Sequence, residues 1–264
     1  MSQKTRLRMT VSYDGTDFCG WQKQTHENRS SVQEILQTAF ERVFQEKLTL
    51  YASGRTDAGV HARSQVIHFD VSRSEQALKG WDIPWAVKRS IPDSISVKRV
   101  WVAPTEFHAN LSPIGKTYKY YIWNHPRFPA FMNRYSLWVR KELNLDLMQE
   151  FSKLVLGEHD FKSFQSVGTP IKTTVRKIES CGWRVVKPHL IEFEITGSGF
   201  LKQMVRNIVG TQLLLEKKEM GPSDFKHILE ARNRVIAGPP AEPQGLFLHQ
   251  VYYPSRLDKQ CREI

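Results

Sequence analysis

Residues 48–71 read LTLYASGRTDAGVHARSQVIHFDV and place one long loop between two strand-like segments. The second segment alternates in polarity, with Ile67, Phe69 and Val71 on one face and His68 at the opposite parity. The loop runs over about nine residues, although two to five are enough to close a hairpin. This pattern indicates two strands of a sheet joined by a loop that is longer than a hairpin requires.

The composition of this loop favours a functional site over an ordinary turn. Gly54 and Gly59 permit backbone conformations that other residues resist. In a plain turn, Asp57 would only accept backbone hydrogen bonds. No turn type requires Arg55 two residues before that aspartate, so both interpretations stay open on the residues alone.

A metal site is a third interpretation of the same stretch. Its ligands would be Asp57, His61 and His68, with His68 pointing away from the core. No His-x-His or His-x-x-x-His spacing and no second carboxylate cluster supports it. The three cysteines lie far apart without a CxxC pair, which argues against a disulfide framework and against a zinc site; they are Cys19, Cys181 and Cys261.

Strand and helix patterns alternate along the whole chain. Residues 30–46 carry apolar side chains at helical spacing behind a serine cap. The patterns predict strands at 6–13, 48–53, 65–71, 96–104, 116–123, 173–186, 189–197 and 245–253, and helices at 30–46, 83–91, 144–157, 200–218 and 222–232.

The order of these elements suggests a duplicated architecture. A first unit closes near residue 104, and a second unit repeats the mixture of strands and helices, so we expect two subdomains, 1–104 and 105–264. The predicted fold is α+β (α/β): two similar RRM-like subdomains that form an extended mixed, mostly antiparallel sheet with helices mainly on one side.

The charge balance points to a polyanionic partner. The 264 residues include 38 Lys and Arg against 27 Asp and Glu, a net charge of +11. A basic chain of otherwise globular composition favours nucleic acid, and the aromatic residues interleaved with lysines in KTYKYYIW (116–123) suit stacking on bases. A merely solubilising charge excess is the alternative.

No apolar run reaches the roughly 18 residues of a membrane helix, and the N-terminus lacks the apolar region of a signal peptide. We therefore expect a cytoplasmic protein with no membrane association.

Two further segments are candidates for a site. The stretch ITGSGFLKQMVRN (195–207) joins a strand to a helix through Gly-Ser-Gly, and amides at a helix start are a natural anion site. Arg206 lies off the edge of that helix's apolar stripe. In the strand at 116–123, Tyr118, Tyr120 and Ile122 share one face.

Six segments together resemble the tRNA pseudouridine synthases of the TruA family, in the right order from about residue 9 to residue 253. They are YDGTDFCGWQ, SGRTDAGVHA, FHANLSPIGKTYKYYI, HDFKSF, GSGFLKQMVRNIVG and GLFLHQVYY. The resemblance implies isomerisation of uridine to pseudouridine at positions 38 to 40 in the anticodon stem-loop of tRNA. It also implies a homodimer, a basic central cleft where the two subdomain sheets join, and no cofactor or metal.

The resemblance also assigns roles to individual residues. Asp57 matches the family's catalytic aspartate, Tyr118 the tyrosine that stacks near the target base, and Arg206 the arginine that pairs with the aspartate. Tyr118 is also the candidate base for the C5 proton. Arg55 is expected to help fill the space that the target base leaves or to hold the flanking RNA backbone. The sequence departs from the family pattern at Asn110, where many members have Arg, and after HDFKSF, where Gln165 replaces Cys.

Two other classes of function remain to be tested. A non-catalytic RNA-binding or chaperone module would have the same charge and aromatic content, with Asp57 incidental. A metal-dependent nuclease would lose its activity in excess chelator.

Overall fold

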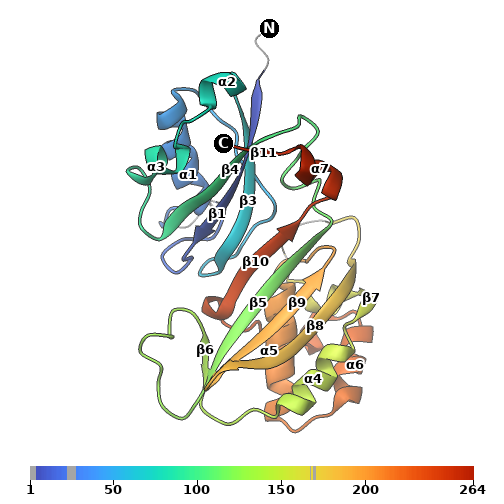
Figure 1. Cartoon of the computed structure of the whole chain (residues 1–264). Helices are drawn as coiled ribbons and strands as arrows, with labels where there is room; N and C mark the ends of the chain where they lie inside the picture. The colour runs from blue at the N-terminus through green and yellow to red at the C-terminus, as the bar shows by residue number, and fades with distance from the viewer. Residues whose placement is uncertain (1–3, 23–27, 167, 169–170) are drawn as a thin grey trace. The chain divides into compact units, whose positions relative to one another are not determined.

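The computed structural model describes residues 4–22, 28–166, 168 and 171–264 (Figure 1). Contacts divide the chain into two compact units. The first unit comprises Met1–Ile114 and Leu248–Ile264, and the second comprises Gly115–Phe247. The sequence places its subdomain boundary after residue 104 and assigns the C-terminal segment to the second subdomain. The assignment of the catalytic aspartate to one subdomain and of its tyrosine and arginine partners to the other stays a prediction.

The sheet of the first unit is built around β1 (Thr5–Tyr13), whose residues alternate between fully and partly buried. This strand pairs antiparallel with β3 (His61–Val71) on one side and with β4 (Ile95–Ala103) on the other. The short strands β2 (Tyr51–Ala52) and β11 (Arg262–Glu263) extend β3 and β4.

Helix α1 (Val32–Phe44) supplies the largest apolar face of this unit's core. It begins at Ser31, whose side chain accepts a hydrogen bond from the Glu34 amide at 3.2 Å, as expected of a serine cap. Its Phe40 ring lies 4.9 Å from the ring of Phe69 on β3. The remaining helices of the unit are short: α2 (Glu75–Leu78), α3 (Ile83–Lys88) and α7 (Ser255–Gln260).

The second unit holds an antiparallel array in the order β5 (Gly115–Asn124), β9 (Leu190–Gly197), β8 (Val175–Lys187) and β7 (Gly157–Asp160). The short strand β6 (Leu137–Val139) runs parallel to β5. The strand β10 (Leu246–Tyr252) carries the chain from the end of the second unit back into the first.

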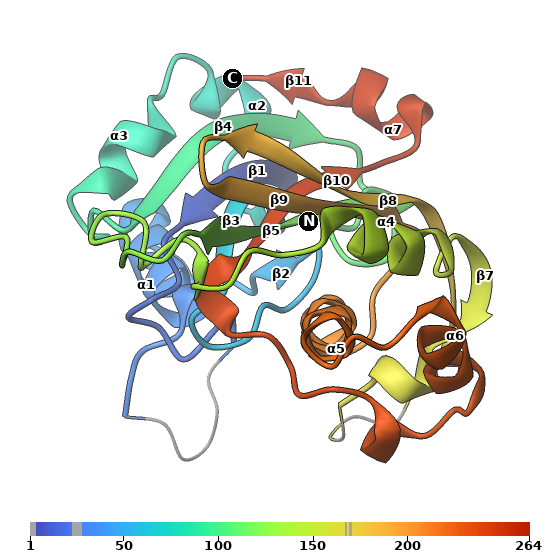
Figure 2. The same ribbon diagram turned by 90° about the horizontal axis from the view of Figure 1, so that it is seen from below.

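Three helices cover one face of this array: α4 (Leu145–Lys153), α5 (Met204–Lys217) and α6 (Pro222–Glu230) (Figure 2). Trp183 on β8 fixes the sheet to α5, because its indole N–H donates to Gln212 Oε1 at 2.7 Å. Its ring also packs on Phe193 at 4.8 Å. The opposite face carries an ionic cluster in which Lys119 lies 2.9 Å from Glu194 and 3.3 Å from Glu192.

The expected fold class is confirmed: the chain is α+β, with a large, mostly antiparallel sheet and most of its helices packed on it. Among the described helices, none has the length and apolar character needed to cross a bilayer. The elements that the sequence patterns do not predict are short ones, chiefly β6, β7, β11, α2 and α7, whose few residues show no periodicity.

One expected feature of the second unit is wrong. The Gly-Ser-Gly turn does not open a helix, because β9 ends at Gly197 and α5 begins only at Met204, after Gln203 in the left-handed region (φ 59°). The amides of that turn are therefore not the first amides of α5, and the anion site expected there is not supported.

Candidate active site

Asp57 lies in a tight turn between two buried residues. The Val60 amide donates to the Asp57 carbonyl at 3.1 Å, and Gly59 adopts φ +76°, a conformation that favours glycine. Thr56 and Val60 are buried, whereas Asp57 is partly exposed. The turn thus buries its two flanks and leaves Asp57 itself partly exposed.

Residues 13–21 support this turn from the other side. The Tyr13 hydroxyl lies 2.8 Å from the Thr56 hydroxyl, and the Trp21 amide donates to the Thr56 carbonyl at 3.0 Å. Burial raises the pKa of Tyr13 to about 12, so its hydroxyl stays protonated as a hydrogen-bonding group. These contacts hold the residue immediately before Asp57.

Two glycines allow residues 13–21 to approach so closely. A Cβ on Gly20 (φ +104°) would lie 2.6 Å from the Thr56 carbonyl oxygen and 3.0 Å from the Asp57 carbonyl carbon. A Cβ on Gly15 would lie only 2.0 Å from the Val60 carbonyl oxygen. Any side chain at either position would push the Asp57 turn away. The sequence does not predict that residues 13–21 support the Asp57 turn. Gly15 and Gly20, which precede a helix, are the signal that could have indicated such a close approach.

The start of the loop is tied to β3. Gln65 donates from Nε2 to the Gly54 carbonyl at 2.8 Å, and Ser53 donates from its hydroxyl to Gln65 Oε1 at 2.5 Å. Both Gln65 and Ser53 are fully buried. The loop is therefore fixed before and after Asp57. The exposed side chain of Arg55 lies between these anchors.

His61 joins the end of the loop to residues 14–15. Its ring is 1% exposed, and Nδ1 accepts a hydrogen bond from the Gly15 amide at 3.0 Å. Asp14 Oδ1 lies 3.2 Å from the same nitrogen. Both contacts of this nitrogen therefore come from residues 14–15, and they join the end of the loop to that segment. The geometry gives His61 a structural role.

His68 lies opposite to Ile67 and Phe69 in parity, as expected, but it does not point to solvent. It is 1% exposed, its ring stacks on Tyr51 at 4.9 Å, and Nδ1 accepts from the Ala109 amide at 3.1 Å. Burial, together with the nearby charge of Arg6 and His108, lowers its pKa to about 4. The expectation of an outward-pointing histidine is wrong, because residues 107–109 and Tyr51 cover this face of β3.

The metal interpretation finds no support in this geometry. In both His61 and His68 the Nδ1 atom is occupied by a backbone amide. Across the described ranges, no three His, Cys, Asp or Glu side chains are grouped so that they could hold a metal ion.

Tyr118 lies on β5 in the second unit, opposite Ile195 of β9. Its side chain is 8% exposed and packs edge-on against Phe200 at 5.0 Å between ring centroids. Tyr120 on the same face is fully buried, because Gly245 leaves room for its ring. Tyr118 is therefore held in one orientation at the end of a packed aromatic face.

Arg206 lies in the first turns of α5 and is only 8% exposed, so the alternative of a solvated surface arginine does not hold. Its Nε donates to the Ala241 carbonyl at 2.7 Å, and the Ala241 amide donates back to the Arg206 carbonyl at 2.9 Å. The first bond holds the guanidinium group at Nε, and the second joins the backbones of the two segments.

The four residues proposed from the sequence thus fall into two sets. Arg55 and Asp57 lie in one loop of the first unit, and Tyr118 and Arg206 lie on β5 and α5 of the second. The joint action of the two sets is a prediction of the family resemblance.

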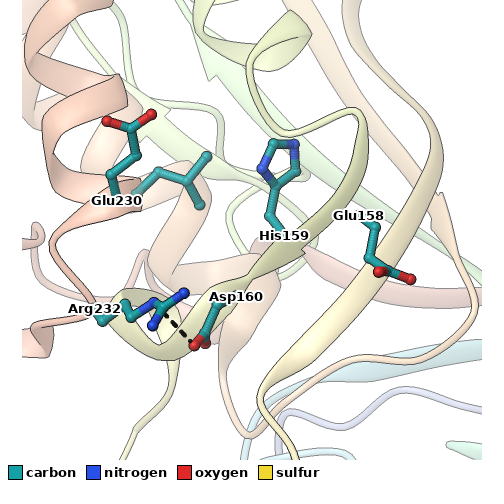
Figure 3. Close-up of a pocket in the computed structure, with 6 residues that line it drawn as sticks. Glu158, His159, Asp160, Glu230 and Arg232 are labelled. Atoms are coloured by element: carbon teal, nitrogen blue, oxygen red, sulfur yellow. Dashed lines mark ion pairs between the residues drawn. The ribbon is translucent and has the colours of Figure 1, made fainter.

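A hollow elsewhere in the second unit is unsuited to a polyanion. It lies between β7 and α6 (Figure 3) and is lined by Glu158, His159, Asp160, Leu229, Glu230 and Arg232. Asp160 is already engaged by Arg232 at 3.2 Å and by the Lys162 amide at 3.1 Å. Three carboxylates around one opening repel phosphate groups.

Comparison with known proteins agrees with the motifs. A family model described as tRNA pseudouridine synthase matches residues 9–110 and 151–254, one segment with the Asp57 loop and one with Arg206. The chain is 54% identical to tRNA pseudouridine synthase A of Bdellovibrio bacteriovorus, over 98% of this chain and 99% of that protein.

More distant bacterial relatives have the same name. The tRNA pseudouridine synthase A of Bacillus subtilis is 39% identical over 94% of this chain and 99% of its own length. That of Ruminiclostridium cellulolyticum is 38% identical, also over 94% and 99%. The chain belongs to the tRNA pseudouridine synthase family.

Proposed function

We propose that this protein isomerises uridine to pseudouridine at positions 38 to 40 in the anticodon stem-loop of tRNA, with Asp57 as the catalytic carboxylate. The observation that carries the proposal is the full-length 54% identity to a tRNA pseudouridine synthase A. The partly exposed, doubly anchored Asp57 within GRTDAGVHA supports the choice of residue.

The reaction explains why a carboxylate is needed. Breaking the C1′–N1 glycosidic bond develops positive charge at C1′, which an adjacent carboxylate can stabilise or trap covalently. The uracil then turns, C1′ bonds to C5, and the proton on C5 must leave. Asp57 either attacks C1′ or assists removal of the C2′ proton. A primary isotope effect with 2′-deuterated uridine in the tRNA would identify the second route.

The other proposed residues act around this carboxylate. Arg206 pairs with Asp57 and keeps it ionised, and its burial together with the bond from Nε to the Ala241 carbonyl supports a fixed place for this side chain. Tyr118 stacks on the target base and removes the C5 proton. Arg55, exposed on the same loop as Asp57, holds the flanking RNA after the base has left its stack, a step that costs a few kcal/mol.

The active form we propose is a homodimer that binds one tRNA across both subunits in the cytoplasm, without a cofactor or metal. The net charge of +11 supports a polyanionic substrate.

The decisive experiment measures tritium release from tRNA labelled with [5-³H]uridine. Wild-type protein should release tritium, and Asp57→Asn should release none above background while still binding tRNA. Asp93→Asn is the matched control, because that aspartate is almost fully exposed and pairs only with Lys88 among its described contacts. Normal release by Asp57→Asn would refute the catalytic assignment.

The competing proposal of a non-catalytic RNA-binding or chaperone module rests on the basic charge and the aromatic content of the chain. Mass analysis of tRNA from a deletion strain separates the two proposals. Loss of pseudouridine from the anticodon arm supports the enzyme, and unchanged pseudouridine supports the binder. Full activity in excess chelator would exclude a metal-dependent nuclease.

A further inference from the structure

The loop between β5 and β6, residues 125–136, extends from the second unit as a long segment without helix or strand (Figure 1). At its tip the Pro129 carbonyl accepts hydrogen bonds from the amides of Met132 at 3.0 Å and Asn133 at 2.9 Å. This turn displays Phe131, whose side chain is 95% exposed. None of the residues assigned to the proposed reaction lies in this loop.

The base of the loop is held in place. The Trp138 indole N–H donates to the His125 carbonyl at 2.8 Å, and Phe128 packs edge-on against the Trp138 ring at 5.2 Å. Ser136 donates from its hydroxyl to the Met132 carbonyl at 2.8 Å. Because both ends of the loop are tied down, Phe131 is presented at a defined place.

A phenylalanine at such a tip is unusual on physical grounds. Turn tips take Gly, Asn, Asp or Ser, which tolerate the backbone and remain hydrated. An aromatic ring exposed this far loses the free energy that burial would supply. Phe128 and Tyr135 in the same loop are also exposed, at 56% and 36%. Phe131 is therefore an aromatic ring that the fold leaves almost wholly exposed, beside two rings that are only partly exposed.

The charge of the surrounding sequence specifies the partner. No Asp or Glu occurs between Glu106 and Glu142, and the loop and its flank carry cations at Arg127, Arg134, Arg140 and Lys141. A polyanion with flat apolar faces satisfies both the charge and the exposed rings, and unpaired nucleotides have both properties.

We propose that the loop 125–136 is an RNA-docking element in which Phe131 stacks on an unpaired base of the tRNA while Arg127 and Arg134 contact its phosphates. The proposal rests on the proposed function, because it takes tRNA as the substrate. It adds a stacking contact away from Asp57, Tyr118 and Arg206.

The test measures binding of an unmodified tRNA transcript to full-length Phe131→Ala by fluorescence anisotropy. We expect Kd to rise at least about fivefold, as loss of one base–aromatic stack predicts. Phe131→Trp should keep near-wild-type affinity because it keeps the stacking surface. Val235→Ala is the matched control, since Val235 is 88% exposed in the same unit and lies outside the loop.

The proposed phosphate contact of Arg127 is tested separately, through the salt dependence of tRNA binding. Arg127→Gln should lower the magnitude of the slope of log K against log salt concentration by about 0.7 to 0.9. An unchanged slope would remove the phosphate contact from the proposal.

Two results would overturn the docking element. One is an affinity of Phe131→Ala equal to that of the wild type. The other is a changed sedimentation mass of RNA-free Phe131→Ala, which would identify the loop as a contact between protein chains.

Tritium release separates this proposal from the proposed function. A wild-type protein that binds tRNA through Phe131 but releases no tritium refutes the enzyme only. An active wild type with an unaffected Phe131→Ala refutes the loop only.

Discussion

Tyr13 and Thr56 share a hydrogen bond between two buried hydroxyl groups, one residue before Asp57. We predict that Tyr13→Phe lowers kcat while KM for tRNA stays near the wild-type value, because the carboxylate loses its anchor and the RNA contacts remain. The loss of one buried hydrogen bond costs about 1 kcal/mol of stability. Steady-state tritium-release kinetics and thermal melting measure the two effects.

Thr56→Ser is the conservative counterpart, since it retains the hydroxyl and should keep kcat close to the wild-type value. Equal losses in Tyr13→Phe and Thr56→Ser would show that the hydroxyl pair does not position Asp57.

Tyr118 gives a second prediction at the residue scale. Tyr118→Phe keeps the ring that packs on Phe200 but removes the hydroxyl proposed to accept the C5 proton. Turnover should fall strongly while tRNA affinity is retained. Turnover equal to that of the wild type would exclude Tyr118 as the base.

His68 links pH to stability through a single buried ring. Its pKa is about 4 in the folded protein against 6.5 for the free side chain. In the unfolded chain, the His68 ring therefore binds a proton below about pH 6.5. In the folded chain, it binds this proton only below about pH 4. The free energy of unfolding is therefore unaffected by protonation of this ring above pH 6.5. It decreases as the pH falls from 6.5 towards 4, by up to about 3 kcal/mol.

Denaturant unfolding of the wild type and His68→Gln across this pH range checks the effect. The variant should show a shallower decline in the free energy of unfolding, and parallel curves would contradict it. NMR titration of the ring provides the pKa independently.

At the scale of elements, the Asp57 turn is shaped by contact with residues 13–21 rather than by its own sequence. We predict that Gly20→Ala sharply reduces activity and lowers the melting temperature, because its Cβ would lie 2.6 Å from the Thr56 carbonyl oxygen. Gly80→Ala is the control. Gly80 also has a positive φ (+79°), but nothing lies within 4 Å of its Cβ position.

The two glycine variants share the backbone strain and differ in the steric contact. Gly80→Ala should therefore melt slightly below the wild type and retain full tritium release. If both variants kept full activity, the close approach of the two segments would not matter for catalysis.

At the scale of the whole molecule, the proposed homodimer predicts a sedimentation mass of twice 30.7 kDa for the RNA-free protein. A dimer supplies two copies of each basic surface to one tRNA, which strengthens binding without new contacts. Analytical ultracentrifugation at several protein concentrations measures the mass. A mass of 30.7 kDa throughout would restrict the proposal to a monomeric enzyme.

The long elements could be predicted from the sequence because each has enough residues to display its period. The helical pattern around Leu36 and Phe40 and the alternation through Phe69 correspond to α1 and β3. Short strands such as β6 and β7 have no such signal, because they form by pairing with a neighbour that is distant in sequence.

The candidate site was predicted in part. Asp57 and Arg55 stand out because a turn needs neither an arginine nor so many residues. The burial of Arg206 and His68 could not be read from the helical wheel or the strand parity. Periodicity predicts the face of the helix or strand on which a side chain lies, but a segment distant in sequence covers that face. Residues 107–109 cover His68, and Ala241 contacts Arg206.

The sequence by itself determined the order of the long elements, the basic charge and the family, because these depend on local periods, composition and the spacing of motifs. The tertiary structure alone decided how the loop at 52–62 is held. Its anchors are Tyr13, Gly20 and Gln65, which precede or follow Asp57 by many residues. Close approach between such segments depends on the absence of a side chain at one position and a hydroxyl at another. The glycine and the hydroxyl can be read in the sequence, but which segment each of them contacts is decided only when the chain has folded.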